Sequence, residues 1–319
     1  MIIRTVTAAA ALLALATPVV AQQSLKAAVT AAMSEAIEDS RYAEILAGYG
    51  LELPGPDEQG LVNSADYPYP EIEAGTLLEH VMDRGDLRLG WIAVGAPWSV
   101  PGPDPAEPVG LSIEYWALVQ EKLNAHYGTD IALDWVEYTG STGNNDMYLW
   151  LSRDDDPDCA ASGSEGCYDI IGGAYAINAQ RKEVSDITPA YYPLNMSLVR
   201  THVPLPEGTP PLDTAEDVRA AMADGALGLA LAGLADTGES VILDNIRKET
   251  GDTFTILERP ASSDVLDFAD TTDAAHFVLG TNVRLATTRK AHPEYCADCE
   301  FIPNLLIFGG VGFATALPE

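Results

Sequence analysis

Arg181 is the residue whose chemistry is most easily matched to a small bound molecule. It ends the run Asn178-Ala179-Gln180-Arg181 and lies eight residues after Gly173. A guanidinium group is planar and carries its donors as a fork, so it can hold a carboxylate through two parallel hydrogen bonds. The alternative is an exposed helical arginine in an ion pair. Because 17 basic residues face 48 acidic ones in this chain, we favour a binding role for Arg181.

Four cysteines form two local pairs, Cys159 with Cys167 and Cys296 with Cys299. An even number in an exported chain indicates disulfides, and pairing within each local pair is the simplest of the possible arrangements. Cys296-Ala-Asp-Cys299 also fits a redox motif, but no strand is predicted before it and no helix after it. Zinc held by both pairs is a further alternative. We expect two disulfides, no metal and no cofactor.

Three side chains are candidates for a general acid or base, namely Glu114, Asp236 and His276. No Ser-His-Asp arrangement, phosphate-binding loop or metal-ligand motif accompanies them. The acidic run from Asp154 to Asp158 lacks the spaced ligands of a calcium loop, so a solvated insertion is the simpler interpretation, and calcium binding is left open. The residues therefore favour a protein that is not an enzyme.

The charge of the chain excludes some partners. A formal net charge of −31 repels phosphate backbones and anionic membranes, so nucleic acid is not an expected partner. An anionic ligand would need a local basic anchor to overcome this field.

The N-terminus has the layout of a secretory signal peptide. Arg4 precedes a mostly apolar run over residues 8–20, and Val19-Val20-Ala21 suits cleavage after Ala21. The run is too short to span a bilayer, which needs roughly 20 apolar residues. We therefore expect residues 1–21 to be removed and the mature protein to lie in the periplasm.

The elements that must position these residues alternate along the chain. Apolar spacing predicts helices at 25–37 and after Ser40, and then a Pro- and Gly-rich linker over 51–74. Further helices are predicted at 76–84, 112–126, 147–152, 215–223 and 239–250. Strand-like segments are predicted at 87–93, 131–138, 168–173, 196–201, 227–232, 254–258, 274–279 and 305–315.

This alternation indicates an α/β fold whose mixed or parallel sheets are flanked by helices. In such sheets ligands bind beyond the carboxyl ends of the strands. The loops after Ala93, Gly173, Ala232 and Leu279 are therefore where a site is expected.

Several stretches, in their order and spacing, resemble the amino-acid-type (family 3) periplasmic extracellular solute-binding proteins. They are TLLEHVMDRGDLRLG (76–90), APWSV (96–100), VGLSIEYWALVQEKL (109–123) and YDIIGGAYAINAQRKEVSDITPAYY (168–192). The resemblance implies a two-lobe fold of type II that closes on its ligand. It implies one lobe of residues 22–50, 75–199 and 304–319, and a second of 200–303. The hinge crossings are then expected at 198–202 and 302–306.

The resemblance also implies a ligand site. Arg181 lies where the family places its carboxylate-binding arginine, and Trp98 and Tyr175 would line the cleft. Core packing is the alternative for both aromatic residues, as helix capping is for Asn178 and a solvated role for Glu114. The full set of ligand-binding candidates is Arg181, Trp98, Tyr175, Gly173, Ala174, Asn178, Glu114, Asp236, Thr237 and Thr281.

One departure from the family concerns the amine of an amino-acid ligand. The aspartate that binds this amine is expected shortly after Asp273, but Thr281 or Asn282 stands there instead. A buried ammonium needs an anionic partner. Either Glu114 or Asp236 replaces the missing aspartate, or the ligand has no α-amine.

The order of the segments also departs from the family. The helical stretch 25–51 resembles the helix that normally follows the last strand, whereas here the similar strand, GGVGFATALPE, lies at 309–319. We expect a circular permutation, with 51–74 joining the old ends, because such rearrangements need only neighbouring termini. The alternative is an unrelated N-terminal helix.

The resemblance implies a monomeric component of an ABC-type uptake system. It would bind a small carboxylate-bearing solute, such as an amino acid or a related organic acid, and dock on an inner-membrane ABC permease. A dehydratase or lyase on the same fold and a ligand sensor that contacts a receptor are the alternatives.

Overall fold

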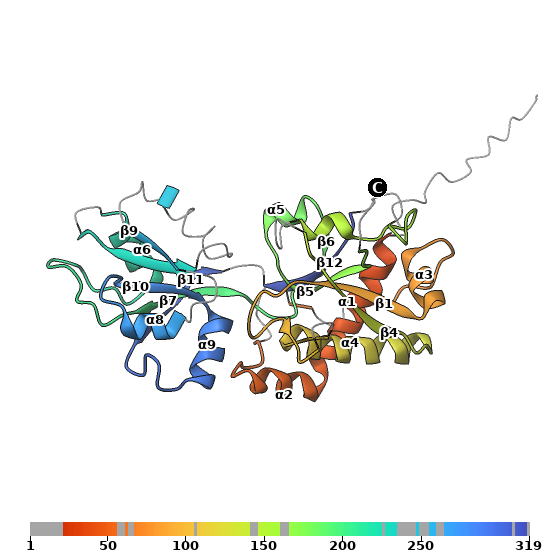
Figure 1. Ribbon diagram of the computed structural model, residues 1–319, viewed down its shortest axis with the longest axis horizontal. Helices are drawn as coiled ribbons and strands as arrows, with labels where there is room; N and C mark the ends of the chain where they lie inside the picture. The colour runs from red at the N-terminus through yellow and green to blue at the C-terminus, as the bar shows by residue number, and fades with distance from the viewer. Residues whose placement is uncertain are drawn as a thin grey trace, which may run out of the picture.

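We examined a computed structural model of the protein, which describes residues 22–55, 61–62, 67–104, 107–140, 146–159, 166–224, 227–234, 247–248, 255–259, 265–307 and 310–317. These residues form two lobes, each built on one five-stranded sheet (Figure 1).

The first sheet has the strand order β4-β1-β5-β12-β6. Its strands are β4 (Ala132–Glu137), β1 (Asp86–Trp91), β5 (Ile170–Ala176), β12 (Val311–Thr315) and β6 (Asp186–Ile187). Strand β1 is parallel to both β4 and β5, whereas β12 is antiparallel to β5 and β6. The parallel strands β4, β1 and β5 therefore all end at one edge of this sheet.

The second sheet has the strand order β11-β7-β10-β8-β9. Its strands are β11 (Glu300–Ile307), β7 (Asn195–Arg200), β10 (Phe277–Thr281), β8 (Ala230–Leu234) and β9 (Thr255–Arg259). Strands β10, β8 and β9 are parallel, and β7 is antiparallel to its neighbours β10 and β11. The two lobes thus repeat one plan, in which three parallel strands are followed in the sheet by one antiparallel strand.

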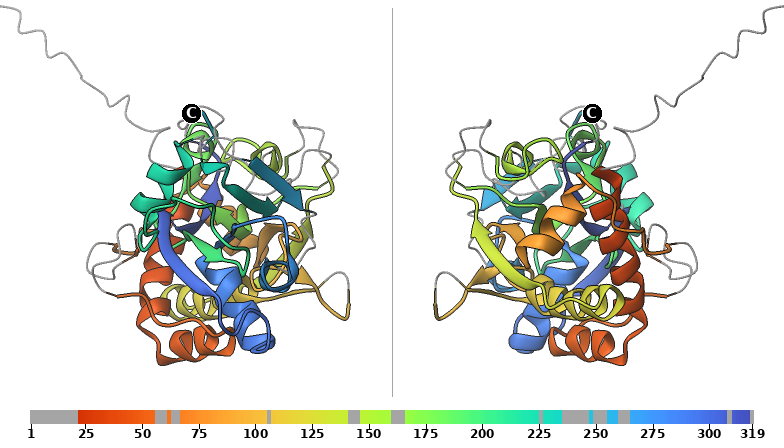
Figure 2. Two further views of the ribbon diagram at one scale, coloured as in Figure 1. Left: turned by 90° about the vertical axis from the view of Figure 1, so that its left-hand side faces the viewer. Right: turned by 90° about the vertical axis from the view of Figure 1, so that its right-hand side faces the viewer.

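Six helical segments cover the first sheet. They are α1 (Gln22–Glu38), α2 (Ser40–Gly48), α3 (Leu77–Arg84), α4 (Leu111–Tyr127), a 3₁₀ turn (Met147–Trp150) and α5 (Ala179–Lys182). Helix α3 begins at Thr76, whose side chain accepts a hydrogen bond from the Glu79 amide, and ends at Gly85 with φ +78°. Viewed end on, α1, α3 and α4 lie around the sheet (Figure 2).

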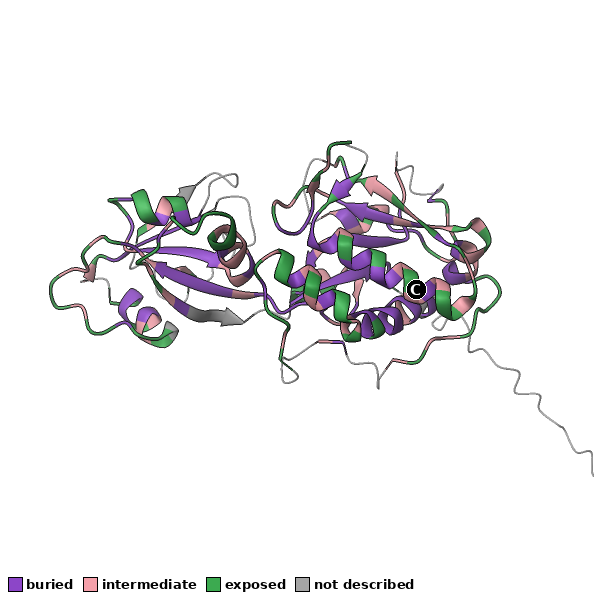
Figure 3. Cartoon of the chain, turned by 90° about the horizontal axis from the view of Figure 1, so that it is seen from below, coloured by how far each residue is buried: buried purple, intermediate pink, exposed green. Residues whose placement is uncertain are grey.

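Helices α1 and α4 join the first sheet in a single core. Tyr115, Tyr191 and Phe313 stack in sequence, with ring centroids 4.7 and 5.0 Å apart. The Trp116 indole donates to the Gly172 carbonyl at 2.9 Å. In both lobes the described strands are largely buried, and the outward faces of the helices are exposed (Figure 3).

Three described helices belong to the second lobe. They are α6 (Ala215–Met222), α8 (Val265–Thr271) and α9 (Asn282–Ala291). Helix α6 has a complete capping box between Thr214 and Asp217. Helices α8 and α9 pack through Val265, Leu266 and Leu285 against one face of the sheet. Helix α6 packs against the other face.

The chain crosses between the lobes twice, close to the pairing of β7 with β11. In the first lobe Tyr192 pairs with Val311, and in the second Asn195 pairs with Ile307. The crossings therefore lie at 193–194 and between 307 and 311. The predicted hinge segments 198–202 and 302–306 overlap β7 and β11 instead, because an apolar strand in sequence does not reveal which sheet it joins.

The described part of the 51–74 connector packs on the first lobe. The Val62 amide donates to the Ala190 carbonyl at 3.1 Å, and the Val62 side chain joins the core. Tyr69 stacks on His126 with ring centroids 3.7 Å apart. Both described ends of the connector are thus fixed to lobe 1.

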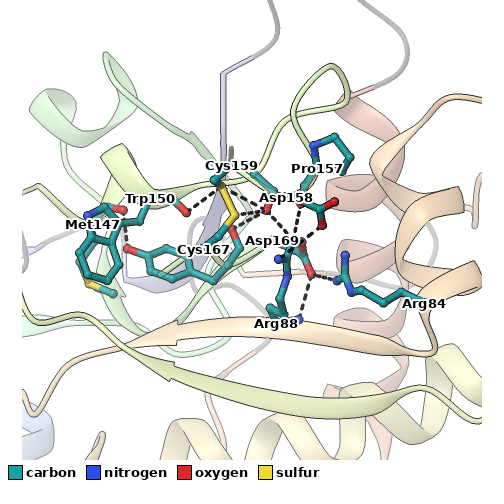
Figure 4. Close-up of a disulfide and its surroundings, with 11 residues drawn as sticks. Arg84, Arg88, Met147, Trp150, Pro157, Asp158, Cys159, Cys167 and Asp169 are labelled. Carbon is teal, nitrogen blue, oxygen red and sulfur yellow. Dashed lines mark hydrogen bonds and ion pairs between the residues drawn. A yellow bond between two sulfur atoms is a disulfide. The ribbon is translucent and has the colours of Figure 1, made fainter. Parts of the chain in front are cut away.

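Both local cysteine pairs are disulfides, Cys159–Cys167 and Cys296–Cys299, as predicted. Figure 4 shows the first beside a buried ion-pair cluster. The fully buried Asp169 carboxylate accepts from the Arg88 amide and guanidinium, each at 2.9 Å, and pairs with Arg84. Arg88 also donates to the Pro157 carbonyl, so the cluster ties β1 to the acidic insertion.

The predicted elements agree with the structure where local periodicity is strong and differ where it is weak. The segment predicted at 305–315 is two strands, β11 and β12, in different sheets. Helices α8 and α9 were not predicted, because α8 is only seven residues long and α9 has few apolar residues. Most of the helix predicted at 239–250 lies outside the described residues. No helix in the described part of the chain is long and apolar enough to cross a membrane.

Candidate functional site

One region where the lobes approach each other lies at the carboxyl end of β1. The lobes also meet where α9 reaches the end of α2, since the Lys290 ammonium donates to the Gly48 carbonyl at 2.7 Å. The loop after β1 contains Gly95, and a Cβ atom built on Gly95 would lie 3.9 Å from the Arg284 Nη2 atom of α9. Helix α9 begins directly after β10, at Asn282. The carboxyl end of one strand from each sheet therefore faces the same space, which is where α/β sheets bind ligands.

Arg181 lies at this edge of the first sheet, on the short helix α5 that follows β5. Its guanidinium carbon lies 4.2 Å from the centroid of the Tyr175 ring, and Nη1 donates to the Ala176 carbonyl at 3.0 Å. The Nε atom is buried without a hydrogen-bond partner. Burial lowers the pKa of Arg181, while Tyr175 acts in the opposite direction.

Arg181 differs from Arg41 and Arg84 of the first lobe in having no counter-ion among the described residues. Arg41 pairs with Asp39 and Glu121, and Arg84 pairs with Asp86 and Asp169. Among the described residues, no carboxylate lies within ion-pair distance of Arg181. In a chain with a net charge of −31, an arginine that is largely buried and has no carboxylate is a place for an anion.

Asn178 acts as the N-cap of α5. Its Oδ1 atom accepts from the Arg181 amide at 2.8 Å. The cap fixes the turn that carries Arg181, and it fits the capping alternative expected from the sequence.

The other predicted residues of β5 lie beneath Arg181. Tyr175 is fully buried, and its ring supports the guanidinium. Ala174 packs partly against the core, and Gly173 is buried beside Trp91 without crowding. Close packing occurs one residue earlier, at Gly172, where a built Cβ would lie 2.9 Å from the Leu89 Cβ atom.

Trp98 lies in the core below the loop that follows β1. It is 7% exposed, and its ring meets the Tyr191 ring edge to face at 6.4 Å. The loop reaches Trp98 through a cis peptide bond between Ala96 and Pro97. A wall of the ligand pocket at Trp98 therefore stays a prediction, and the core contact is what the structure describes.

Glu114 is exposed in the first turn of α4, where it accepts a hydrogen bond from the Tyr49 hydroxyl at 2.6 Å. Tyr49 is the C-cap residue of α2. The Glu114 carboxylate therefore links α4 to the end of α2 and does not contact Arg181.

On the second lobe, Thr281 and Asn282 begin α9. The Thr281 hydroxyl accepts from the Arg284 amide at 3.2 Å, as an N-cap. The Asn282 Oδ1 atom accepts from the Asn195 amide at 3.1 Å, which ties the helix to the first crossing. Asp236 and Thr237, predicted at the same site, lie outside the described residues.

Arg284 is a residue near the β1 loop that the sequence did not single out. It follows Thr281 by one helical turn and extends toward Gly95 of the other lobe. Recognition of α9 as a helix would have found it, since the first turn after a parallel strand faces the ligand edge.

The two described candidates for acid–base chemistry, Glu114 and His276, are not grouped at this edge. His276 lies at the amino end of β10, away from Thr281, and its Nδ1 atom accepts from the Ala230 amide at 2.9 Å. Asp154 of the acidic run accepts a hydrogen bond from the Leu77 amide, at the start of α3. The described residues contain no group of three or more His, Cys, Asp or Glu side chains placed to hold a metal ion.

Comparisons with known proteins agree with this geometry at the level of the fold. No family model and no curated protein matches the sequence. Among solved structures, PfVFT1 of Plasmodium falciparum is similar with a TM-score of 0.59 and 13% identity, over 93% of this chain and 97% of that one. An ancestral cationic amino acid solute binding protein, AncCDT-1, is similar with a TM-score of 0.51 and 16% identity. That likeness covers 76% of this chain and 87% of AncCDT-1.

Both neighbours have two lobes, and the resemblance expected from the sequence is therefore confirmed for the fold. The strand order that the two sheets share, with one antiparallel strand in each, agrees with it. The chain adopts the two-lobe fold of periplasmic binding proteins and Venus flytrap domains.

Proposed function

We propose that this protein is a solute-binding protein that closes its two lobes on a small molecule bearing a carboxylate. The observation that carries the proposal is that Arg181 lacks partners for its buried guanidinium among the described residues. Its guanidinium is largely buried on Tyr175, its Nε atom has no hydrogen-bond partner, and no described carboxylate pairs with it. A ligand carboxylate would supply both the missing acceptor and the missing charge.

Closure follows from the position of this site between lobes that are joined by two short crossings. Residues 193–194 form the first crossing, and the second lies between 307 and 311. A ligand held by Arg181 that also contacts α9 binds the closed arrangement more tightly, and so shifts the population toward it.

The wider role is the one implied by the family resemblance. The protein would be exported after removal of residues 1–21 and would act as a monomer in the periplasm. There the closed form would deliver an amino acid or related organic acid to an ABC permease. AncCDT-1 bears the name of an amino acid solute binding protein, which agrees with this class of ligand.

The first test is thermal unfolding of the mature protein with a panel of amino acids, keto acids and dicarboxylates. Binding to the folded state alone stabilises it by ~2.7 kcal/mol when the ligand is at a hundredfold excess over its dissociation constant. We expect the unfolding midpoint to rise with at least one carboxylate, and this rise to disappear in Arg181→Gln.

Lys182→Gln is the matched control, because Lys182 is the next residue on α5 and is exposed. It is expected to retain the ligand-dependent shift. A panel without any shift, or a shift that survives in Arg181→Gln, would contradict the proposal. A ligand that is consumed over time in the presence of the protein would instead indicate an enzyme.

A further inference from the structure

A second arginine, for which the described residues supply no counter-ion, faces the same region from the other lobe. Arg284 lies in the first turn of α9, and its Nη2 atom approaches the Gly95 loop after β1. Its backbone amide is bonded to the Thr281 hydroxyl, so the turn that carries it is fixed. Its guanidinium forms no ion pair with any carboxylate in the described part of the chain.

The two other cations of α9 have partners within the protein. The Arg289 guanidinium stacks on Phe301, with its carbon 4.8 Å from the ring centroid. Lys290 donates to the carbonyls of Ala47 and Gly48 at the end of α2. Arg284 is therefore the cation of α9 whose guanidinium has no partner in the part of the chain that the structure describes.

Arg181 and the loop that Arg284 approaches lie at one edge of the first sheet. Arg181 is anchored at the end of β5, and Arg284 lies against the loop that follows β1. Strands β1 and β5 are parallel neighbours, and a Cβ built on Gly173 would lie 3.4 Å from the Trp91 Cα atom. Two guanidinium groups brought to this edge without carboxylates repel each other, and a molecule with two anionic groups would neutralise both.

We infer that the ligand is a small dicarboxylate, with one carboxylate held by Arg181 of lobe 1 and the other by Arg284 of lobe 2. This inference rests on the proposed function and names its ligand class. It makes Arg284 the residue that determines specificity, because a monocarboxylate leaves it unpaired. It also explains how ligand favours closure, since the second carboxylate is engaged only when α9 lies near the β1 loop.

The test uses pairs of ligands that differ by one charge. Succinate is compared with monomethyl succinate, and L-glutamate with L-glutamine, by isothermal titration calorimetry on the mature protein. We expect at least one diacid to bind about tenfold or more tightly than its partner, the change expected for one charge-assisted hydrogen bond. Arg284→Gln is expected to abolish this preference, whereas Arg289→Gln, a change on the same helix, is expected to preserve it.

Arg284→Lys retains the charge and is expected to keep the diacid preference, which covers the case in which Arg284→Gln destabilises the fold. If neutral partners bind as tightly as diacids, or if the preference survives in Arg284→Gln, the inference is wrong. The proposed function then still stands, provided that Arg181→Gln abolishes binding. If no ligand of either class binds, both fail.

Discussion

At the scale of single residues, the fold depends on a few charges that are fully buried. The Asp169 carboxylate has no exposed surface and receives hydrogen bonds from Arg84 and Arg88. Loss of one partner from a buried pair leaves the other charges unpaired, which is far more costly than loss of a surface pair. Asp158 shows the contrast, because it is 79% exposed and lies 3.9 Å from Arg88.

We expect Asp169→Ala to lower the free energy of unfolding by about 3 kcal/mol or more, because two arginines lose their shared carboxylate. Urea denaturation followed by circular dichroism measures this change. Asp158→Ala is the control, and it should alter the free energy of unfolding by less than about 1 kcal/mol. Equal effects of the two substitutions would show that the burial of Asp169 does not account for its contribution to the free energy of unfolding.

His276 adds a pH dependence at the residue scale. Burial lowers the pKa of His276 below its usual value. The Nδ1 atom accepts a hydrogen bond from the Ala230 amide at 2.9 Å. The unfolded chain therefore takes up a proton at a higher pH than the folded protein does. The contribution of His276 to stability is complete above about pH 6.5 and is lost as the pH falls below that value.

His276→Asn keeps an acceptor for the Ala230 amide but does not titrate. We expect the free energy of unfolding to fall less between pH 7 and pH 5.5 in this variant than in the wild type, as measured by urea denaturation at each pH. His202→Asn, at an exposed histidine, is expected to match the wild type. Parallel pH profiles for His276→Asn and the wild type would contradict the assignment.

At the scale of elements, α5 is too short to be stable alone and depends on its cap. Helices of one turn gain little from propagation, so a side-chain bond at the first residue has a large share in fixing them. Asn178 provides this bond to the Arg181 amide at 2.8 Å. The cap thus positions the proposed carboxylate anchor without contact with the ligand.

We expect Asn178→Ala to weaken binding of any carboxylate found by the thermal panel by roughly fivefold, in line with the ~1 kcal/mol typical of a lost cap. Asn178→Asp, which can still accept from the Arg181 amide, tests the cap but adds a charge near Arg181. Asn178→Ser is therefore the better rescue. Gln180→Ala, on the exposed side of α5, should leave affinity unchanged in calorimetry.

At the scale of the whole molecule, the two chain segments that the predicted circular permutation would join lie side by side in lobe 1. The Lys26 ammonium at the start of α1 pairs with Asp186, and Asp186 is the strand partner of Thr315 in β12. The start of α1 thus lies beside the end of β12. This proximity is what a permutation requires, because both ends can then be joined by a short link.

A chain that begins at residue 75, runs to 317, and continues through a short Gly-Ser link into 24–50 tests the permutation. We expect it to fold, although less stably than the wild type because the Val62 and Tyr69 contacts are lost, and to show the same ligand-dependent shifts, since it keeps every helix and strand named above. A control chain opened inside α4 at residue 118 is expected not to fold. If the first chain also fails to fold, the connector is essential and the permutation hypothesis is wrong.

The sequence by itself determined the elements that local chemistry encodes. Helix α3 was predictable from its apolar spacing and from Gly85, and both disulfides from the short separation of their cysteines. Arg181 could be singled out because it lies where the resembling family places its carboxylate-binding arginine, and its fork of donors suits a carboxylate. These features depend on neighbours along the chain, which a sequence displays directly.

Only the tertiary structure decided which strands share a sheet and which cations lack a counter-ion. Sheet membership places β7 and β11 in the second lobe and so moves the crossings, because an apolar run has the same pattern in either sheet. Arg284 became notable only when α9 was seen to begin at the cleft with its guanidinium near Gly95. Pairing of strands and of charges joins residues that are distant in sequence, and the energy of each pair depends on burial that no local pattern specifies.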